Sequence, residues 1–274
     1  MIKLNSLEII DNKCSLGEGI CVKNDASAWV DIDQKEMIYF AHNSLSKYFL
    51  SEVPSNIFDF SKSKAIIGTD MGIIKLNLNT NKIQNLSKKI PWNSKFYRTN
   101  DGCIFEDTII IGVMHKFNPV ENIGGLYRFD NGVFTLLDNN INIPNSFIRL
   151  GKNEILISDS LTREIWLYKF DDKKSISNKR LWYKFEDSVS PDGGCIIDDK
   201  ILFALWDGSS IAVFSKTGKL EQKISLPVPR PTNCKYNKMH NKIWITSASV
   251  GLSKYQIQKF PISGKTLVYS LNKV

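Results

Sequence analysis

The chain has 274 residues, of which 42% are apolar, and it carries a formal net charge of +8. It is long enough to bury a large core. No stretch approaches the roughly 18 consecutive apolar residues of a membrane-spanning helix, so we expect no membrane partner. The Lys and Arg residues are scattered singly or in pairs, and no basic run is interleaved with aromatic residues. This distribution predicts a solvated basic surface and argues against a nucleic-acid partner.

Short apolar stretches, rich in β-branched and aromatic residues, follow one another along the whole chain. Gly, Asn, Asp and Lys turns separate them, and helical periodicity is nearly absent, so we expect strands throughout. The first stretch covers residues 3–10. Five groups of four follow, at residues 20–22, 28–32, 37–40 and 47–50; 57–60, 65–68, 72–76 and 83–86; 103–105, 108–111, 126–129 and 133–137; 147–150, 154–158, 165–170 and 181–185; and 195–197, 201–205, 211–214 and 223–226. A sixth group begins at residues 233–236 and 242–246.

A polar side chain on a turn precedes the first strand of five groups, at Glu18, Asn100, Asn145, Asp192 and Asn233. The last four are 41 to 47 residues apart, and Glu18 precedes Asn100 by two steps of 41 residues. A period of about 40–50 residues with four strands per unit is typical of a β-propeller. We therefore predict an all-β chain, a six-bladed β-propeller with four antiparallel strands per blade. Residues 1–274 would form a single domain, in which the N-terminal strand completes the last blade.

A large β-sandwich is the main alternative fold, but it gives no reason for a constant period. In a β-propeller the first strand of every blade lines a central channel, so the five polar residues would converge at one rim. The second strand returns antiparallel, and its end would reach the same rim. Most of these ends are also polar, at Asp31, Asp70, Met114-His115, Asp159-Ser160, Trp206-Asp207 and Ser247. We expect the functional site at this rim.

Glu18, Asn145 and Asp192 are candidate ligands of one divalent cation. They offer two carboxylates and an amide oxygen, which are hard donors suited to Ca²⁺, Mg²⁺ or Mn²⁺. Two carboxylates close together in a partly buried channel repel each other unless a cation neutralises them. We expect Ca²⁺, with Mg²⁺, Mn²⁺ or Zn²⁺ as alternatives. The competing interpretation is that each residue only caps a turn.

The five cysteines, Cys14, Cys21, Cys103, Cys195 and Cys234, form no CxxC pair. Four of them lie in or beside apolar stretches, where a reduced thiol acts as a small buried apolar group. Residues 1–6 lack the apolar segment of a secretory signal. An odd number of cysteines without an export signal predicts a cytoplasmic location.

A set of short motifs occurs in order between about residues 14 and 250: Gly17-Glu18-Gly19, Arg98-x-Asn100-Asp101-Gly102, Gly124-Gly125-Leu126-Tyr127, Pro144-Asn145, Asp159-Ser160, Pro191-Asp192-Gly193, and Leu226-Pro227 followed by Pro231-Thr232. With this set the chain resembles the regucalcin/gluconolactonase family of sugar-lactone hydrolases. The resemblance implies a six-bladed propeller whose channel holds a divalent cation at Glu18, Asn145 and Asp192. It also implies that Arg98 and Asn100 contact the substrate.

The activity that this resemblance implies is metal-dependent hydrolysis of a small sugar-acid lactone. The cation would act as a Lewis acid on the lactone carbonyl, and Asp192 is the candidate general base for the attacking water. Arg98, Asn100 and Asp101 would hold hydroxyl or carboxylate groups of the sugar, although Asp101 could instead support Arg98 or the turn. His115 is a further candidate substrate-binding residue.

Two departures from the family pattern leave other functions open. Ser146 follows Asn145 where the family usually has glycine, and the loop of residues 114–117 carries His115 and Lys116 where well-known members carry acidic residues. One alternative is a phosphotriesterase-like or arylesterase-like hydrolase on the same scaffold. The other is a non-catalytic propeller that binds a sugar or a metal.

Overall fold

The computed structural model describes residues 2–171 and 174–273 of the chain. In these ranges it contains six four-stranded antiparallel sheets and one short helix, α1 (Lys254–Lys259). These sheets are the blades of a six-bladed β-propeller, which confirms the predicted fold class. By its contacts the chain divides into two compact units, one of residues up to Phe49 together with those from Ser188 onward, the other of Leu50–Asp187.

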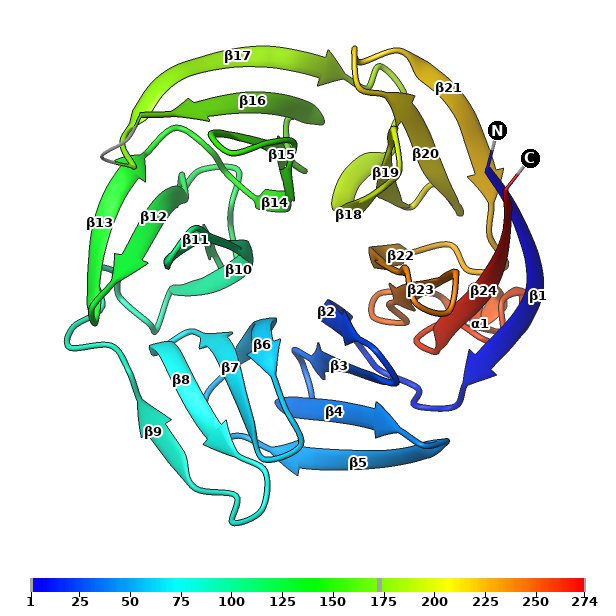
Figure 1. Ribbon diagram of the computed structural model, residues 1–274, viewed down its shortest axis with the longest axis horizontal. Coiled ribbons are helices and arrows are strands. Elements are labelled where there is room, and N and C mark those ends of the chain that lie inside the picture. The colour runs from blue at the N-terminus through cyan, green and yellow to red at the C-terminus, as the bar shows by residue number, and fades with distance from the viewer. Residues whose placement is uncertain (1, 172–173, 274) are drawn as a thin grey trace. The chain divides into compact units, whose positions relative to one another are not determined.

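The unit of Leu50–Asp187 contains three sheets, and in each the strands follow one another in chain order (Figure 1). The first sheet has β6 (Pro54–Phe60), β7 (Lys64–Thr69), β8 (Gly72–Asn77) and β9 (Ile83–Asn85). The second has β10 (Tyr97–Phe105), β11 (Thr108–His115), β12 (Gly125–Asp130) and β13 (Val133–Asp138). The third has β14 (Pro144–Arg149), β15 (Glu154–Asp159), β16 (Glu164–Phe170) and β17 (Ile176–Lys184). The first strand of the middle sheet, β10, contacts the first strands of both neighbours, β6 and β14.

The other unit also contains three sheets. One has β2 (Gly17–Lys23), β3 (Ala26–Asp31), β4 (Glu36–Ala41) and β5 (Ser44–Phe49), and another has β18 (Ser190–Ile197), β19 (Lys200–Trp206), β20 (Ser210–Ser215) and β21 (Leu220–Ser225). The third joins β22 (Pro231–Asn237), β23 (Lys242–Ser247) and β24 (Thr266–Lys273) to β1 (Ile2–Ile10), which is its outermost strand. Strand β22 contacts both β2 and β18.

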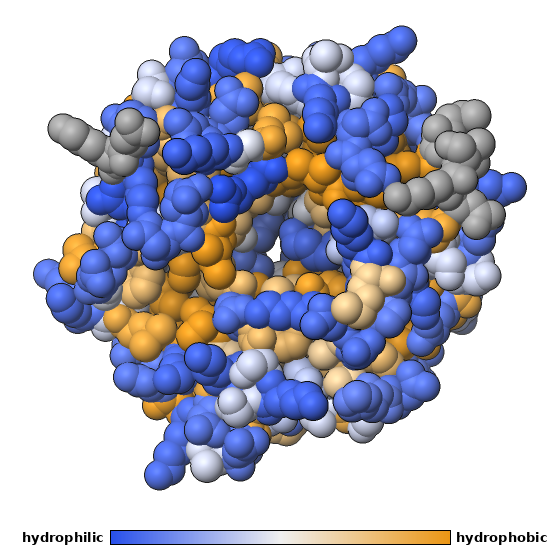
Figure 2. Space-filling model, viewed as in Figure 1, coloured by the Kyte–Doolittle hydropathy of each residue, from blue (hydrophilic) through white to orange (hydrophobic). Residues whose placement is uncertain are grey.

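The inner strands are apolar on both faces because neighbouring sheets pack against each other. Trp29 and Ile38, for example, share a buried cluster with Trp244 and Val268 of the adjacent sheet. Outermost strands such as β21 alternate between half-buried and exposed residues, as expected for strands with one solvated face. On the face drawn in Figure 2, hydrophilic residues accordingly predominate at the surface. No helix among the described residues is long and apolar enough to span a membrane.

The cysteines are all free, and three of them are buried. Burial raises the pKa of the Cys14 thiol to about 12, so this thiol stays neutral at physiological pH. Cys195 and Cys234 lie on neighbouring strands, with their sulfur atoms 3.8 Å apart. The structure thus places these thiols as the sequence predicts, as small groups within the apolar core.

Every first strand has a break in its pairing register close to its start. The breaks lie between Glu18 and Cys21, Pro54 and Asn56, Thr99 and Gly102, Asn145 and Ile148, Pro191 and Gly194, and Pro231 and Asn233. A β-bulge re-aims the side chains beside it, and bulges are frequent next to functional sites. A polar residue stands at each break, either as the last paired residue before it (Glu18 and Asn145) or as the first residue within it (Ser55, Asn100, Asp192 and Thr232). We call these six residues the bulge positions.

Three aspartates at the ends of second strands hold the segment that leads into the first strand of their own sheet. Asp31 accepts hydrogen bonds from the backbone N–H groups of Ser15 and Leu16, at 2.8 and 3.1 Å. Asp159 repeats this arrangement with the N–H groups of residues 142 and 143, at 2.7 and 3.1 Å, and also accepts one from residue 161. Asp70 accepts one from residue 53 at 2.9 Å. These carboxylates therefore fix the backbone that precedes a bulge position.

We expect the substitution Asp159→Ala to destabilise the protein by about 2–4 kcal/mol, because it leaves several partly buried N–H groups without an acceptor. Urea denaturation measures the change. Asp33→Ala is the control, since Asp33 is exposed and accepts a hydrogen bond from the exposed Ser15 hydroxyl, and it should cost less than about 0.5 kcal/mol. Equal stabilities of the two variants would show that the Asp159 bonds do not hold the strand entry.

Candidate active site

The bulge positions of β10 and β14 are joined directly by a hydrogen bond. The Asn100 Nδ2 group donates to Asn145 Oδ1 at 2.8 Å and to the Pro144 carbonyl at 3.0 Å. Asn145 Nδ2 donates to the Ser160 hydroxyl at 2.8 Å. Both amides are buried. These bonds fix which end of the Asn145 amide is the oxygen, and a fixed, buried oxygen is what a cation ligand requires.

Arg98 lies beside this pair on β10. Its Nη1 group donates to Asn100 Oδ1 and, at 3.0 Å, to the Thr99 carbonyl. The arginine thus turns the oxygen of Asn100 toward itself and the NH₂ group toward Asn145. The structure therefore brings together three residues that the sequence predicts for the site, and it gives Asn100 the role of orienting Asn145.

Asp101 is buried, and its Oδ1 atom accepts a hydrogen bond from the Gly102 backbone N–H at 2.8 Å. This contact lies within the bulge of β10. Of the two roles that the sequence leaves open for Asp101, the contact favours support of the turn.

His115 ends β11, opposite Tyr97 of β10. Its Nδ1 atom accepts hydrogen bonds from the backbone N–H groups of Phe117 and Asn118, at 3.2 and 2.9 Å. Two donors at Nδ1 place the ring proton on Nε2, so the neutral ring presents a donor. Its ring packs edge-on against Tyr97, with centroids 5.0 Å apart. This geometry favours substrate binding by His115 over the role of general base.

Lys116, the other residue of this loop that departs from the family pattern, is bound by neighbouring groups of the chain. Its ammonium group lies 2.8 Å from the Asp70 carboxylate and 2.6 Å from the Ser94 carbonyl. The side chain ties the loop to the preceding sheet.

Two carboxylates occupy bulge positions in the other unit. Glu18 is 9% exposed and accepts a hydrogen bond from the Gly19 backbone N–H at 2.9 Å, and Asp192 is 6% exposed. Their strands, β2 and β18, both contact β22. The third predicted ligand, Asn145, belongs to the unit of Leu50–Asp187.

Strand β22, which contacts both β2 and β18, contributes two polar residues, Thr232 and Asn233. The Thr232 hydroxyl donates to the Gly17 carbonyl, next to Glu18. Asn233 is fully buried and lies against Gly193, next to Asp192. Neither amide atom of Asn233 has a hydrogen-bond partner among the residues that the structure describes.

These residues suit a hard divalent cation. In one unit Glu18 and Asp192 supply buried carboxylates, and Asn233 supplies a buried amide whose polar atoms have no hydrogen-bond partner among the described residues. In the other unit Asn145 supplies an oriented amide oxygen. A set made only of oxygen donors favours Ca²⁺, Mg²⁺ or Mn²⁺. Within the described ranges no three His, Cys, Asp or Glu side chains lie close enough together to hold a metal ion. The predicted ligand set contains only two residues of these types, because its third member is an asparagine.

The sequence prediction did not include the bulge positions Ser55 and Thr232. It treated Asn233 as the residue of its sheet that is equivalent to Asp192. The pairing register instead makes Thr232 the equivalent of Asp192. Pro231, which precedes Thr232, pairs with the end of β23, and Pro191, which precedes Asp192, pairs near the end of β19. The sequence does contain a pattern that marks these positions. Proline directly precedes the bulge position in four sheets, at Pro54, Pro144, Pro191 and Pro231.

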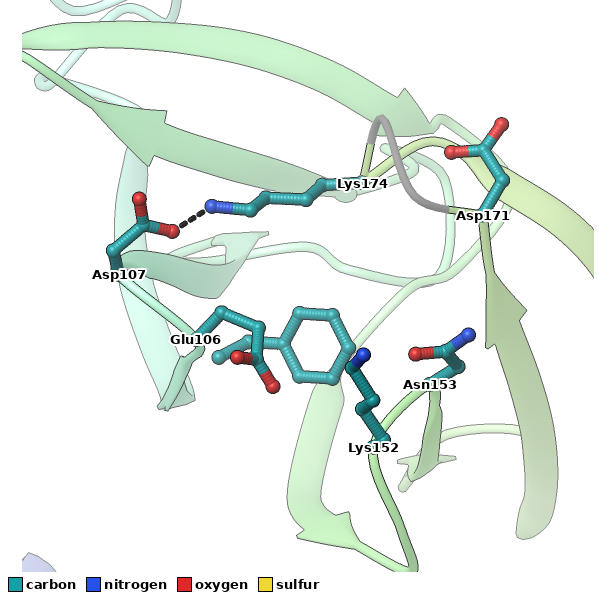
Figure 3. A pocket seen from close by; sticks show the side chains of 7 residues that line it. Glu106, Asp107, Lys152, Asn153, Asp171 and Lys174 are labelled. Carbon is teal, nitrogen blue, oxygen red and sulfur yellow. Dashed lines mark ion pairs between the residues drawn. The ribbon is translucent and has the colours of Figure 1, made fainter.

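A pocket of about 500 Å³ lies at the other end of β10 and β14, away from Asn100 and Asn145 (Figure 3). The end of β10 and the turns between strands supply its lining residues: Phe105, Glu106, Asp107, Lys152, Asn153, Asp171 and Lys174. Lys174 forms an ion pair with Asp107 across it. The pocket contains no residue that the sequence predicts for the site.

Comparison with known proteins identifies relatives along most of the chain. A sequence model of the family described as SMP-30/Gluconolactonase/LRE-like region matches residues 16–249. L-arabinolactonase of Azospirillum brasilense is 24% identical over 279 residues, covering 95% of this chain and 90% of that protein. Regucalcin of Gallus gallus is 34% identical over 111 residues, which are 39% of this chain and 37% of that protein. The chain thus matches only about a third of the length of regucalcin at this level of identity.

Two solved structures share the fold. The calcium-binding protein regucalcin from Agrobacterium tumefaciens superposes with a TM-score of 0.87 at 19% identity, covering 94% of this chain and 90% of that chain. A gluconolactonase from Xanthomonas campestris superposes with a TM-score of 0.75 at 13% identity, covering 97% and 89%.

Proposed function

The chain belongs to the SMP-30/Gluconolactonase/LRE-like family, and from this membership we propose that it is a divalent-metal-dependent hydrolase that opens a small sugar-acid lactone. One observation carries the step from family to reaction. Four of the six bulge positions hold buried carboxylate or amide oxygens, at Glu18, Asn100, Asn145 and Asp192, and of these the Asn100 oxygen accepts a hydrogen bond from Arg98. The names L-arabinolactonase and gluconolactonase, borne by relatives, support a sugar lactone as the substrate class.

Glu18, Asn145 and Asp192 would hold the cation, and the calcium-binding relative supports Ca²⁺. A bound cation would polarise the lactone carbonyl and stabilise the negative charge that develops on its oxygen. Asn100 assists by keeping the Asn145 oxygen in place, since it donates to that oxygen at 2.8 Å.

Asp192 acts as the general base. It accepts a proton from the water molecule whose oxygen forms a bond to the lactone carbonyl carbon. The bond between that carbon and the ring oxygen then breaks, and the departing oxygen takes the proton back from Asp192. The product is the open-chain hydroxy acid, so neither an oxidant nor a second substrate is required.

Arg98 and His115 position the sugar. The guanidinium of Arg98 offers donors for hydroxyl or carboxylate oxygens, and the Nε2–H of His115 offers a single neutral donor. Correct placement of the lactone relative to the base contributes to rate because it removes the entropy cost of alignment.

A panel of aldonolactones, with a phosphotriester and an aryl ester beside them, tests this function. We expect turnover of at least one aldonolactone that stops on addition of a chelator and returns with added Ca²⁺, Mg²⁺ or Mn²⁺. Preferred turnover of the phosphotriester or aryl ester would assign the related hydrolase activity instead. Cation binding without any turnover would identify a binding protein.

A further inference from the structure

Asn233 is a fully buried amide that the proposed mechanism does not use. It lies in β22 directly after the bulge position Thr232, and its exposed fraction is 0%. Nδ2 and Oδ1 both lack hydrogen-bond partners among the described residues. A buried amide without partners is unfavourable, so such a group in a folded protein calls for an explanation.

The amide of Asn233 lies against the backbone of the residue that follows Asp192. A Cβ atom added to Gly193 would come within 2.1 Å of Asn233 Cγ, 2.3 Å of Nδ2 and 2.4 Å of Oδ1. A side chain at residue 193 would therefore force the Asn233 amide to move, because that amide fills the space a Cβ atom would take.

Thr232, the residue before Asn233, contacts the backbone beside the other carboxylate, Glu18. The Thr232 hydroxyl donates to the carbonyl of Gly17, which directly precedes Glu18. Thr232 and Asn233 thus contact the backbone beside Glu18 and beside Asp192. An amide oxygen is a common ligand of Ca²⁺.

We propose that Asn233 is a further residue of the cation site, and that its Oδ1 atom binds the cation held by Glu18 and Asp192, directly or through one water molecule. This inference rests on the cation of the proposed function. It explains why an amide without protein partners is retained beside a carboxylate, and why Gly193 leaves room for it.

Binding of Ca²⁺ to the metal-free protein, measured by isothermal titration calorimetry without substrate, tests the proposal. Asn233→Leu replaces the amide by an apolar group of similar size. We expect Ca²⁺ to bind about 10–100-fold more weakly, while the melting temperature of the metal-free protein stays the same or rises because an unpartnered amide is removed. Unchanged Ca²⁺ affinity would overturn the proposal.

Asn237→Leu is the matched control. Asn237 is a buried amide at the far end of the same strand, but its Nδ2 group donates to the Asn24 carbonyl at 2.6 Å. This variant should lower the melting temperature and leave Ca²⁺ affinity unchanged. An equal loss of affinity in both leucine variants would show a general effect on β22 and would overturn the proposal.

Asn233→Asp covers the case in which the leucine variant does not fold. It adds a third carboxylate, so we expect tighter Ca²⁺ binding, by about tenfold, and a larger rise in melting temperature on addition of Ca²⁺ than the unmodified protein shows. Affinity equal to that of the unmodified protein would overturn the proposal. If the unmodified protein binds no divalent cation, the metal dependence of the proposed function fails as well, whereas strong binding that Asn233 variants leave unchanged refutes this inference alone.

Discussion

Asp192→Asn will reduce kcat for the lactone by about 10²- to 10⁴-fold, the usual contribution of a general base. The amide has the shape of the carboxylate and still offers an oxygen, but it cannot accept a proton from water. Asp192 is 6% exposed at its bulge position, so water cannot freely replace it in this role. The measurement is kcat at a Ca²⁺ concentration that saturates the variant, which separates loss of the base from loss of the cation.

Asp207→Asn is the control for this experiment. Asp207 follows β19 of the same sheet. Its side chain is half exposed, and its carboxylate forms an ion pair with Arg230 at 2.6 Å. We expect kcat within about twofold of the unmodified protein, since surface substitutions are generally mild. Undiminished kcat in Asp192→Asn at saturating Ca²⁺ would mean that another group, or the cation alone, activates the water.

The sequence predicts the inner strands well because they are buried on both faces. The apolar stretches at residues 154–158 and 201–205 correspond to β15 (Glu154–Asp159) and β19 (Lys200–Trp206). The end of the chain is harder to predict. Helix α1 has only six residues, too few for a helical period, although Ser253 and Gln256 form a capping box at its start. The strand β24 that follows pairs with β1 from the other end of the chain.

The bulges explain why the site could be predicted only in part. Acidic and amide side chains before apolar strands indicated Glu18, Asn145 and Asp192, and in the structure each lies in or directly before a register break. The spacing of the polar residues pointed to Asn233, whereas the pairing register makes Thr232 the equivalent of Asp192, in agreement with the proline that precedes each of them. The sequence also did not distinguish aspartates that hold backbone, such as Asp159, from the proposed ligand Asp192.

Ser146 shows how the chain accommodates a departure from the family pattern. Its φ angle is 78°, in the left-handed region where glycine is favoured, as is that of Gly19 at the matching position after Glu18. The Ser146 hydroxyl lies 2.8 Å from that of Ser158 in the buried interior. This bond offsets part of the cost of the left-handed backbone at Ser146.

Glu18→Gln will weaken Ca²⁺ binding by about 10–100-fold and lower activity in parallel. The substitution removes one of two buried negative charges, and the electrostatic attraction of a divalent cation depends on both. The Glu18 carboxylate accepts the Gly19 N–H at 2.9 Å, a bond that the amide oxygen of glutamine can keep, so the local backbone should be retained. Calorimetry gives the affinity, and a titration of activity with Ca²⁺ should recover kcat at high concentration.

Glu36→Gln provides the matched comparison, because Glu36 is a buried carboxylate of the same sheet that pairs with Lys47 at 2.7 Å. It should lose stability through its broken ion pair and bind Ca²⁺ as the unmodified protein does. A loss of affinity confined to Glu18→Gln would assign that carboxylate to the cation. Full affinity and full activity in Glu18→Gln would instead remove Glu18 from the ligands of the proposed cation.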